Sequence, residues 1–182
     1  MQTITLPTTG TYAIDGTHSN VEITARHMMV TKVRGNFAGV TGTIEVGTNP
    51  AASSVAVEFD AATIDTRVED RNAHLRSADF LDVENYPTIR FVSTEVSHVD
   101  GETFRLTGDL TVRGVTKPIT FDFHYLGNDQ DPWGQERALF EARTKFPREE
   151  WGLGWNAALE SGGVLVSKDF EIEMNISAVL QS

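Results

Sequence analysis

Strict alternation of apolar and polar residues marks the stretch Phe104-Arg105-Leu106-Thr107-Gly108-Asp109-Leu110-Thr111-Val112. Successive side chains of a β-strand point to opposite faces of the sheet, so such a pattern buries one face and leaves the other in water. The stretch therefore predicts a strand with one dry face, on which Leu110 lies.

The same period of two recurs along the chain. It marks eight runs, at residues 21–27, 40–46, 55–59, 89–91, 104–112, 119–125, 138–144 and 170–178. Their apolar faces comprise 31 positions, none of which is Asp, Glu, Lys or Arg, whereas 12 of the 23 intervening positions are charged. A sheet that is dry on one face and wet on the other is typical of antiparallel pairing.

The predicted class is all-β, an extended antiparallel barrel of eight or more strands, because closure removes the sheet edges and places every dry face inside. Turns are expected at Asp100-Gly101 and at Gly127-Asn128-Asp129. The alternation fails from Ser93 to Val99, which predicts a bulge or an early end of that strand. Short strands at residues 12–15 and 33–37 would raise the count from eight toward ten.

One segment has the character of a helix. Residues 67–78 lack Gly, Pro and the period of two, and Asp65 and Thr66 precede them as candidate N-caps. The helix would place Asp70 and His74 one turn apart. A metal site across that turn would need a third ligand, and none is marked, so we expect an ordinary i,i+4 pair and no metal or cofactor.

Length, net charge and cysteine content limit the number of domains and the kinds of function that are possible. A chain of 182 residues suits a single domain, here expected to span 1–182 with a core at about 12–180. The net charge of −11 disfavours nucleic acid as a partner, because such a field repels phosphates. The absence of cysteine excludes disulfides and a thiol nucleophile.

The first seven residues contain neither a basic region nor an apolar stretch typical of a signal peptide. We therefore expect a cytoplasmic protein, or a periplasmic or secreted one only if a leader was removed. No run reaches the roughly 18 apolar residues of a membrane span, so no integral membrane segment is expected.

An eight-stranded barrel has an interior that side chains either fill or leave open for one small ligand. Eight of the inward positions are aromatic: Phe59, Phe91, Phe104, Phe121, Phe123, Tyr125, Phe140 and Phe170. Six others are small: Ala25, Gly42, Gly108, Ala138, Ala142 and Ala178. The periodicity alone leaves a filled core and a cavity equally open; a cavity so lined would favour a long or bulky apolar molecule.

Few polar residues are candidates for chemistry. Asp15, His18 and Ser19 could form a nucleophile and base, but residues so close in sequence are more typical of a turn that starts a strand. His27 lies at an inward position, where it would be either a satisfied core histidine or a contact for a polar head group. Trp151 and Trp155 flank Gly152-Leu153-Gly154 in a loop and would line a cavity mouth or cover the barrel end.

Several motifs follow one another along the chain. They are residues 12–21, residues 63–80 with 86–91, residues 108–118 and residues 148–153. On these motifs the chain resembles the YceI-like family of polyisoprenoid-binding proteins from Tyr12 to Val179. The resemblance implies a lipocalin-like barrel, often dimeric, that holds a long isoprenoid or other fatty chain.

We therefore expect a non-enzymatic protein that carries, stores or sequesters a polyisoprenoid, a quinone tail or a fatty-acid-like lipid. The residues expected to contact this ligand are His27, Phe37, Phe59, Phe91, Leu110, Phe121, Phe123, Phe140, Trp151, Trp155, Phe170 and Met174. Two alternatives stay open. One is an enzyme acting on a hydrophobic substrate in the same cavity, and the other is a filled barrel that acts through its surface.

Overall fold

The computed structural model describes residues 6–182. The strands are β1 (Gly10–Ile14), β2 (Asn20–His27), β3 (Thr31–Phe37), β4 (Thr41–Val46), β5 (Ser54–Asp60), β6 (Thr88–Asp100), β7 (Thr103–Val112), β8 (Val115–Gln130), β9 (Glu136–Pro147) and β10 (Asp169–Leu180). The helices are η1 (Pro50–Ala52), η2 (Ala61–Thr63), α1 (Glu69–Arg76) and η3 (Arg148–Trp151). Each predicted run lies in a strand or within one residue of it, and both predicted short strands are present.

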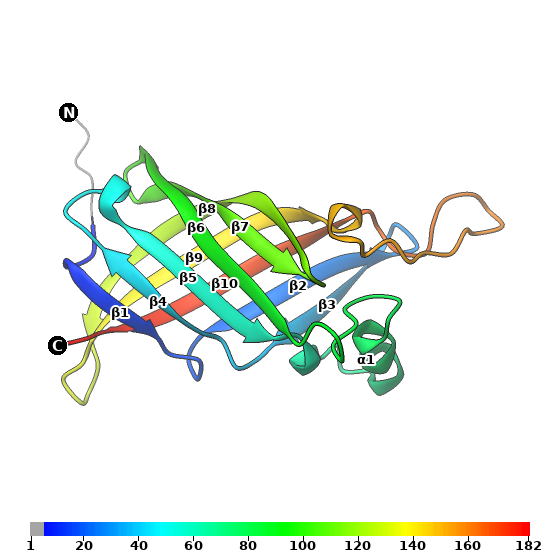
Figure 1. The fold of residues 1–182 in the computed structure, drawn as a ribbon, viewed down its shortest axis with the longest axis horizontal. Coiled ribbons are helices and arrows are strands. Elements are labelled where there is room, and N and C mark those ends of the chain that lie inside the picture. Colours follow the sequence, from blue (N-terminus) through cyan, green and yellow to red (C-terminus); the bar gives the residue numbers. More distant parts are fainter. Residues whose placement is uncertain (1–5) are drawn as a thin grey trace.

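All strand pairings are antiparallel, and eight of them close into a ring. β1 pairs with β4 and β10, β4 pairs with β5, and strands adjacent in sequence pair from β5 to β10. β10 pairs with β1 through residues 178–180 and with β2 through residues 171–175. The strands β1 and β2 therefore lie one after the other along the same edge of β10. The predicted antiparallel barrel is confirmed (Figure 1).

The barrel wall is different at its two ends. One edge of β3 pairs with β2. Its other edge contacts residues 61–66 instead of another strand. Asn36 and Asp65 exchange two backbone hydrogen bonds of 2.9 Å, and the Ala38 amide donates to Thr63 Oγ1 at 3.0 Å. We call this contact between β3 and residues 61–66 the seam. Figure 1 shows α1 and the tip of the β2–β3 hairpin at this end, with β1 and the C-terminus at the opposite end.

The expected irregularity in β6 is a bulge. The register between β6 and β7 shifts between Ser93 and Glu95, and β6 then continues to the turn at Asp100-Gly101, where Gly101 has a φ of 51°. The break in alternation therefore marks an extra residue within one strand and not its end.

The turn predicted at Gly127-Asn128-Asp129 is wrong, because these residues belong to β8. Gly127 has a φ of 115° and the register with β9 shifts between Tyr125 and Gly127, so the glycine forms a bulge. Asn128 keeps the strand in place, since its side chain accepts from Tyr125 Oη at 2.6 Å and donates to Glu136 at 2.8 Å. The turn lies at residues 131–135, where β8 has ended.

The helix is shorter than predicted, and its expected caps are wrong. Val68 is the N-cap residue and makes no side-chain cap hydrogen bond. Thr66 instead donates to the buried Asn72 Oδ1 from both its amide and its hydroxyl, each at 2.7 Å, while an oxygen of Asp65 accepts from Asn72 Nδ2 at 3.0 Å. The two candidate caps therefore fix the turn before the helix through Asn72.

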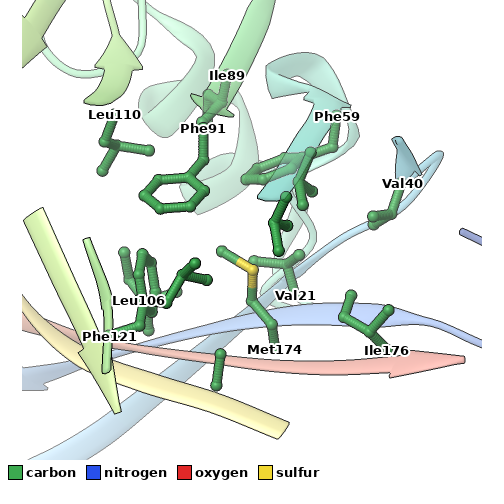
Figure 2. Packing of buried hydrophobic residues seen from close by; sticks show 14 of the residues in the cluster. Val21, Val40, Phe59, Ile89, Phe91, Leu106, Leu110, Phe121, Met174 and Ile176 are labelled. Carbon is green, nitrogen blue, oxygen red and sulfur yellow. The ribbon is translucent and has the colours of Figure 1, made fainter. Parts of the chain in front are cut away.

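Inward positions carry the core, and all eight inward aromatic residues are buried, as predicted. Figure 2 shows Phe91, Phe121 and Met174 extending from different walls toward a common interior. Of the 31 positions expected to face inward, His27 alone is exposed, because β2 ends there beside the hairpin turn, where it pairs with Thr31. Within residues 6–182, no helix is both long enough and apolar enough to cross a membrane.

Candidate functional site

An apolar cavity of about 230 Å³ lies at the end of the barrel that carries the seam. Its walls come from β2, β3 and β10 on one side and from β5, β6, β7 and β9 on the other. Ile64, Thr66, α1 with the segment that follows it, and the loop between η3 and β10 complete it. We call the side of the cavity next to α1 and this loop the mouth. The barrel is therefore hollow in one half, which resolves the alternative between a filled core and a cavity.

Aromatic packing fills the other half of the barrel. The rings of Phe91 and Phe121 pack edge to face, with their centroids 5.2 Å apart. The rings of Phe123 and Phe140 are stacked, with their centroids 5.1 Å apart. Such pairs contribute about 0.5–1.5 kcal/mol each beyond the burial of their area. A second void of about 40 Å³ remains beyond them, next to Tyr125.

Most of the small inward residues do not create the cavity. A Cβ on Gly108 would lie 2.7 Å from Cζ of Phe91, so the phenylalanine ring occupies the space beside that glycine. A Cβ on Gly42 would meet the backbone of Ala56 on the adjacent strand. Of the six small residues, Ala25 alone contributes to the cavity wall.

The structure separates the predicted contact residues into two groups. Those that line the cavity are His27, Phe37, Phe59, Leu110, Trp155, Phe170 and Met174. The others lie outside its wall: Phe91 and Phe121 pack beneath it, Phe123 and Phe140 border the second void, and Trp151 is buried in the wall. They are inward-facing, as predicted, but alternation gives the face of a strand and not the depth along the barrel.

The two tryptophans near the mouth have different roles. Trp151 is 1% exposed, packs on Phe146 at 4.8 Å and donates from Nε1 to the Leu110 carbonyl at 2.8 Å, so it covers the barrel wall. Trp155 is partly exposed and lines the cavity. Trp155 is therefore the tryptophan that borders the cavity, whereas Trp151 packs against Phe146 and Leu110 without lining it.

Sequence reasoning missed the contribution of α1 to the cavity wall. Arg71, His74 and Leu75 line the cavity, and Phe80 and Leu81 follow from the adjoining segment. The helix has no strong apolar stripe, because its inner face combines a leucine with two long polar side chains. Leu75, the single leucine of this polar helix, and the apolar pair Phe80 and Leu81 that follows it were the available signal.

His74 does not pair with Asp70 as expected. Its Nε2 lies 2.9 Å from Asp79, in the turn after the helix, and its ring meets Trp155 edge to face at 4.6 Å. The i,i+4 prediction is therefore wrong, since the chain turns back after Ser77 and brings a closer carboxylate. Within residues 6–182, no group of three His, Asp or Glu side chains is placed to hold a metal ion.

Arg148 fixes the loop at the mouth. It is fully buried, and its guanidinium donates to the carbonyls of Ser167 at 2.8 Å and Trp155 at 3.0 Å, and also to those of Leu153 and Val166. Burial lowers the pKa of this guanidinium from its ordinary value. Among residues 6–182 no carboxylate forms a salt bridge with Arg148; backbone carbonyls accept its hydrogen bonds, its guanidinium lies over the Phe170 ring at 5.4 Å, and these contacts tie both ends of the loop together.

Asp15, His18 and Ser19 form the predicted turn. Asp15 accepts from the Thr17 amide at 2.9 Å, and its other oxygen contacts His18 Nδ1 and Arg137 Nη1, each at 2.8 Å. The hydrogen bond from Arg137, followed by that from His18, holds the pKa of the Asp15 carboxyl well below its usual range. Ser19 bonds to the backbone of β10, so the three side chains make no nucleophile and base arrangement.

Comparisons with known proteins extend these observations. The family model described as the YceI-like domain matches residues 12–178. Protein YceI of Escherichia coli is 40% identical over 145 residues, which cover 78% of this chain and 75% of that protein.

Two solved structures share the fold. BcnA of Burkholderia cenocepacia superposes with a TM-score of 0.79 at 19% identity, covering 90% of this chain and 98% of that one. A polyisoprenoid binding domain from Saccharophagus degradans, implicated in plant cell wall breakdown, superposes with a TM-score of 0.68 at 14% identity, covering 93% and 98%.

Proposed function

Because this chain belongs to the YceI-like family, we propose that its barrel binds one apolar chain and carries, stores or sequesters it without chemical change. The proposed ligands are a polyisoprenoid, a quinone tail or a fatty-acid-like lipid. The name of the Saccharophagus degradans relative, a polyisoprenoid binding domain, supports this ligand class.

The observation that carries the proposal is a hollow lined mainly by hydrocarbon and aromatic rings, next to a half of the barrel that side chains fill. Each methylene that enters such a space gains about 0.8 kcal/mol, so a ten-carbon tail gains roughly 8 kcal/mol. Association opposes binding by about 4–15 kcal/mol. Tails much shorter than ten carbons would therefore bind weakly, and a longer tail or an added polar contact is needed for tight binding.

The cavity size bears on the ligand. Its 230 Å³ lies below the range of roughly 300–1,000 Å³ for pockets that enclose drug-sized molecules. A medium-length tail would be enclosed fully. A long polyisoprenoid would be enclosed at one end, with the remainder passing through the mouth.

Native mass spectrometry of the purified protein, followed by organic extraction, tests the proposal. We expect a stoichiometric lipid, or saturable binding of farnesol added to emptied protein. Ala25→Phe should weaken farnesol binding at least tenfold, because the new ring would occupy the cavity. Thr24→Phe places the same ring on the outer face of the same strand and is the matched control.

Two results would contradict the proposal. One is wild-type protein that contains no lipid and does not bind farnesol or fatty acids saturably. The other is undiminished binding by a folded Ala25→Phe variant.

A further inference from the structure

The titratable side chains that line the cavity all belong to basic residues. Arg26, His27, Arg71 and His74 line the cavity, and no aspartate or glutamate does. This contrasts with the whole chain, in which 26 acidic residues outnumber 15 basic ones. Within residues 6–182, the acidic side chains therefore lie outside the lining of this apolar cavity.

Arg71 is the cation whose position is fixed. From α1, its Nε donates to Thr66 Oγ1 and its Nη2 donates to the Thr66 carbonyl, each at 2.8 Å. Thr66 is itself held by the buried Asn72. The guanidinium is therefore oriented before any ligand arrives, which limits the conformational entropy lost on binding.

Two of the five N–H groups of Arg71 are used in this way. Nη1 makes no hydrogen bond to any of residues 6–182, and Arg71 forms no salt bridge with them. Nη1 and the second hydrogen of Nη2 form the outer edge of the guanidinium, the edge that matches two oxygens of a carboxylate or phosphate.

The nearby carboxylates are engaged elsewhere or point to solvent. Asp65 accepts from Asn72 and from the Arg67 amide, Glu69 pairs with Arg76 at 2.6 Å, and Asp79 contacts His74. Asp70 is exposed and forms no salt bridge with the described residues. None of them neutralises Arg71.

We propose that Arg71 binds the anionic head group of an amphiphile whose tail occupies the cavity. The head group is a carboxylate or a phosphate monoester, held by charge-assisted hydrogen bonds at the mouth. This inference rests on the proposed function and narrows it from apolar chains in general to chains that carry one terminal anion.

Binding of three ligands with the same twelve-carbon tail tests the proposal: dodecanoate, dodecyl phosphate and dodecanol, each measured by calorimetry at a concentration below micelle formation. Wild-type protein should bind the two anions more tightly than the alcohol. Arg71→Gln should weaken binding of the anions by roughly ten- to a hundredfold, as expected for hydrogen bonds to a charged group, and leave dodecanol binding unchanged. Which anion binds more tightly identifies the head group.

Arg76→Gln is the matched control, because Arg76 lies on the same helix, pairs with Glu69 and does not line the cavity. It should leave all three affinities unchanged. Acetate and inorganic phosphate should not compete with dodecanoate, since a head group without a tail lacks the apolar contribution.

The outcomes are distinct. Equal wild-type affinity for the alcohol and the anions, or anion binding that persists in Arg71→Gln, would overturn the head-group site and leave the apolar cavity standing. An equal loss for all three ligands in Arg71→Gln would assign Arg71 a purely structural role and also overturn it. Failure of all three to bind wild-type protein would contradict the proposed function itself.

Discussion

Nε1 of Trp151 donates a 2.8 Å hydrogen bond to the carbonyl of Leu110, 41 positions away in sequence. Leu110 lines the cavity, and Trp151 belongs to η3, which precedes the loop at the mouth. This buried hydrogen bond therefore connects the cavity wall to the segment that precedes the loop at the mouth.

Trp151→Phe should lower the free energy of unfolding by about 1–2 kcal/mol, because it removes this bond and leaves a buried carbonyl with less compensation. The midpoint of thermal unfolding should fall by roughly 2–8 °C for a chain of this length. Trp133→Phe is the control, since Trp133 is 81% exposed and should have no measurable effect. Equal stability of the two variants would show that the bond contributes nothing.

Arg148→Met should reduce the free energy of unfolding by at least about 3 kcal/mol, because it leaves several buried carbonyls without a donor. Hydrogen exchange should speed up across residues 153–167, where the freed carbonyls lie. Arg105→Met, at an exposed position in β7, should change neither quantity. Unaltered exchange in the Arg148→Met variant would contradict the role assigned to this side chain.

Enlarging an alanine should have opposite consequences in the two halves of the barrel. Ala142 is 4% exposed in the packed half, so Ala142→Phe should destabilise by about 1–3 kcal/mol through overpacking. Ala25→Phe enters the cavity and should be neutral or stabilising. Denaturant titration of both variants measures the difference, and equal destabilisation would mean that the hollow is absent in solution.

Acid should weaken the fold partly through Asp15. Its pKa is lowered in the folded protein, chiefly by Arg137, so its contribution is fully present above the unfolded pKa of about 3.9 and is lost as pH falls below that value. Asp15→Asn should destabilise by about 1.5–3 kcal/mol at pH 7 and flatten the decline of stability below pH 4. Asp100→Asn, at an exposed hairpin turn, should leave the acid dependence unchanged. A decline in Asp15→Asn as steep as in wild type would exclude Asp15 as a source.

The barrel could be predicted from the sequence because alternation is a local property of each strand. The run from Phe104 to Val112 reports which side chains face inward without reference to any other strand. The division into a packed and a hollow half could not be predicted in this way. It depends on contacts between strands, such as the ring of Phe91 beside Gly108, whose partners are set by register and bulges.

The candidate site was predictable to a similar extent. The aromatic and aliphatic wall follows from the strand pattern, and Phe37, Phe59 and Phe170 lie where that pattern places them. The position of Arg71 depends on the turn that Thr66 and Asn72 form. The burial of Arg148 depends on how the irregular loop of residues 153–167 folds around it. Neither arginine lies in a strand, so the alternation of apolar and polar residues gives no information about its position.

The seam closes the wall beside the hollow with few backbone hydrogen bonds. Between β3 and residues 61–66, the backbone contact is the pair of hydrogen bonds shared by Asn36 and Asp65, whereas β9 and β10 are joined along eleven aligned residue pairs. Outward displacement of residues 61–66 would thus widen the hollow while the ladders of the packed half stay intact. Entry of a bulkier guest at the seam would therefore break one pair of backbone hydrogen bonds instead of a strand ladder.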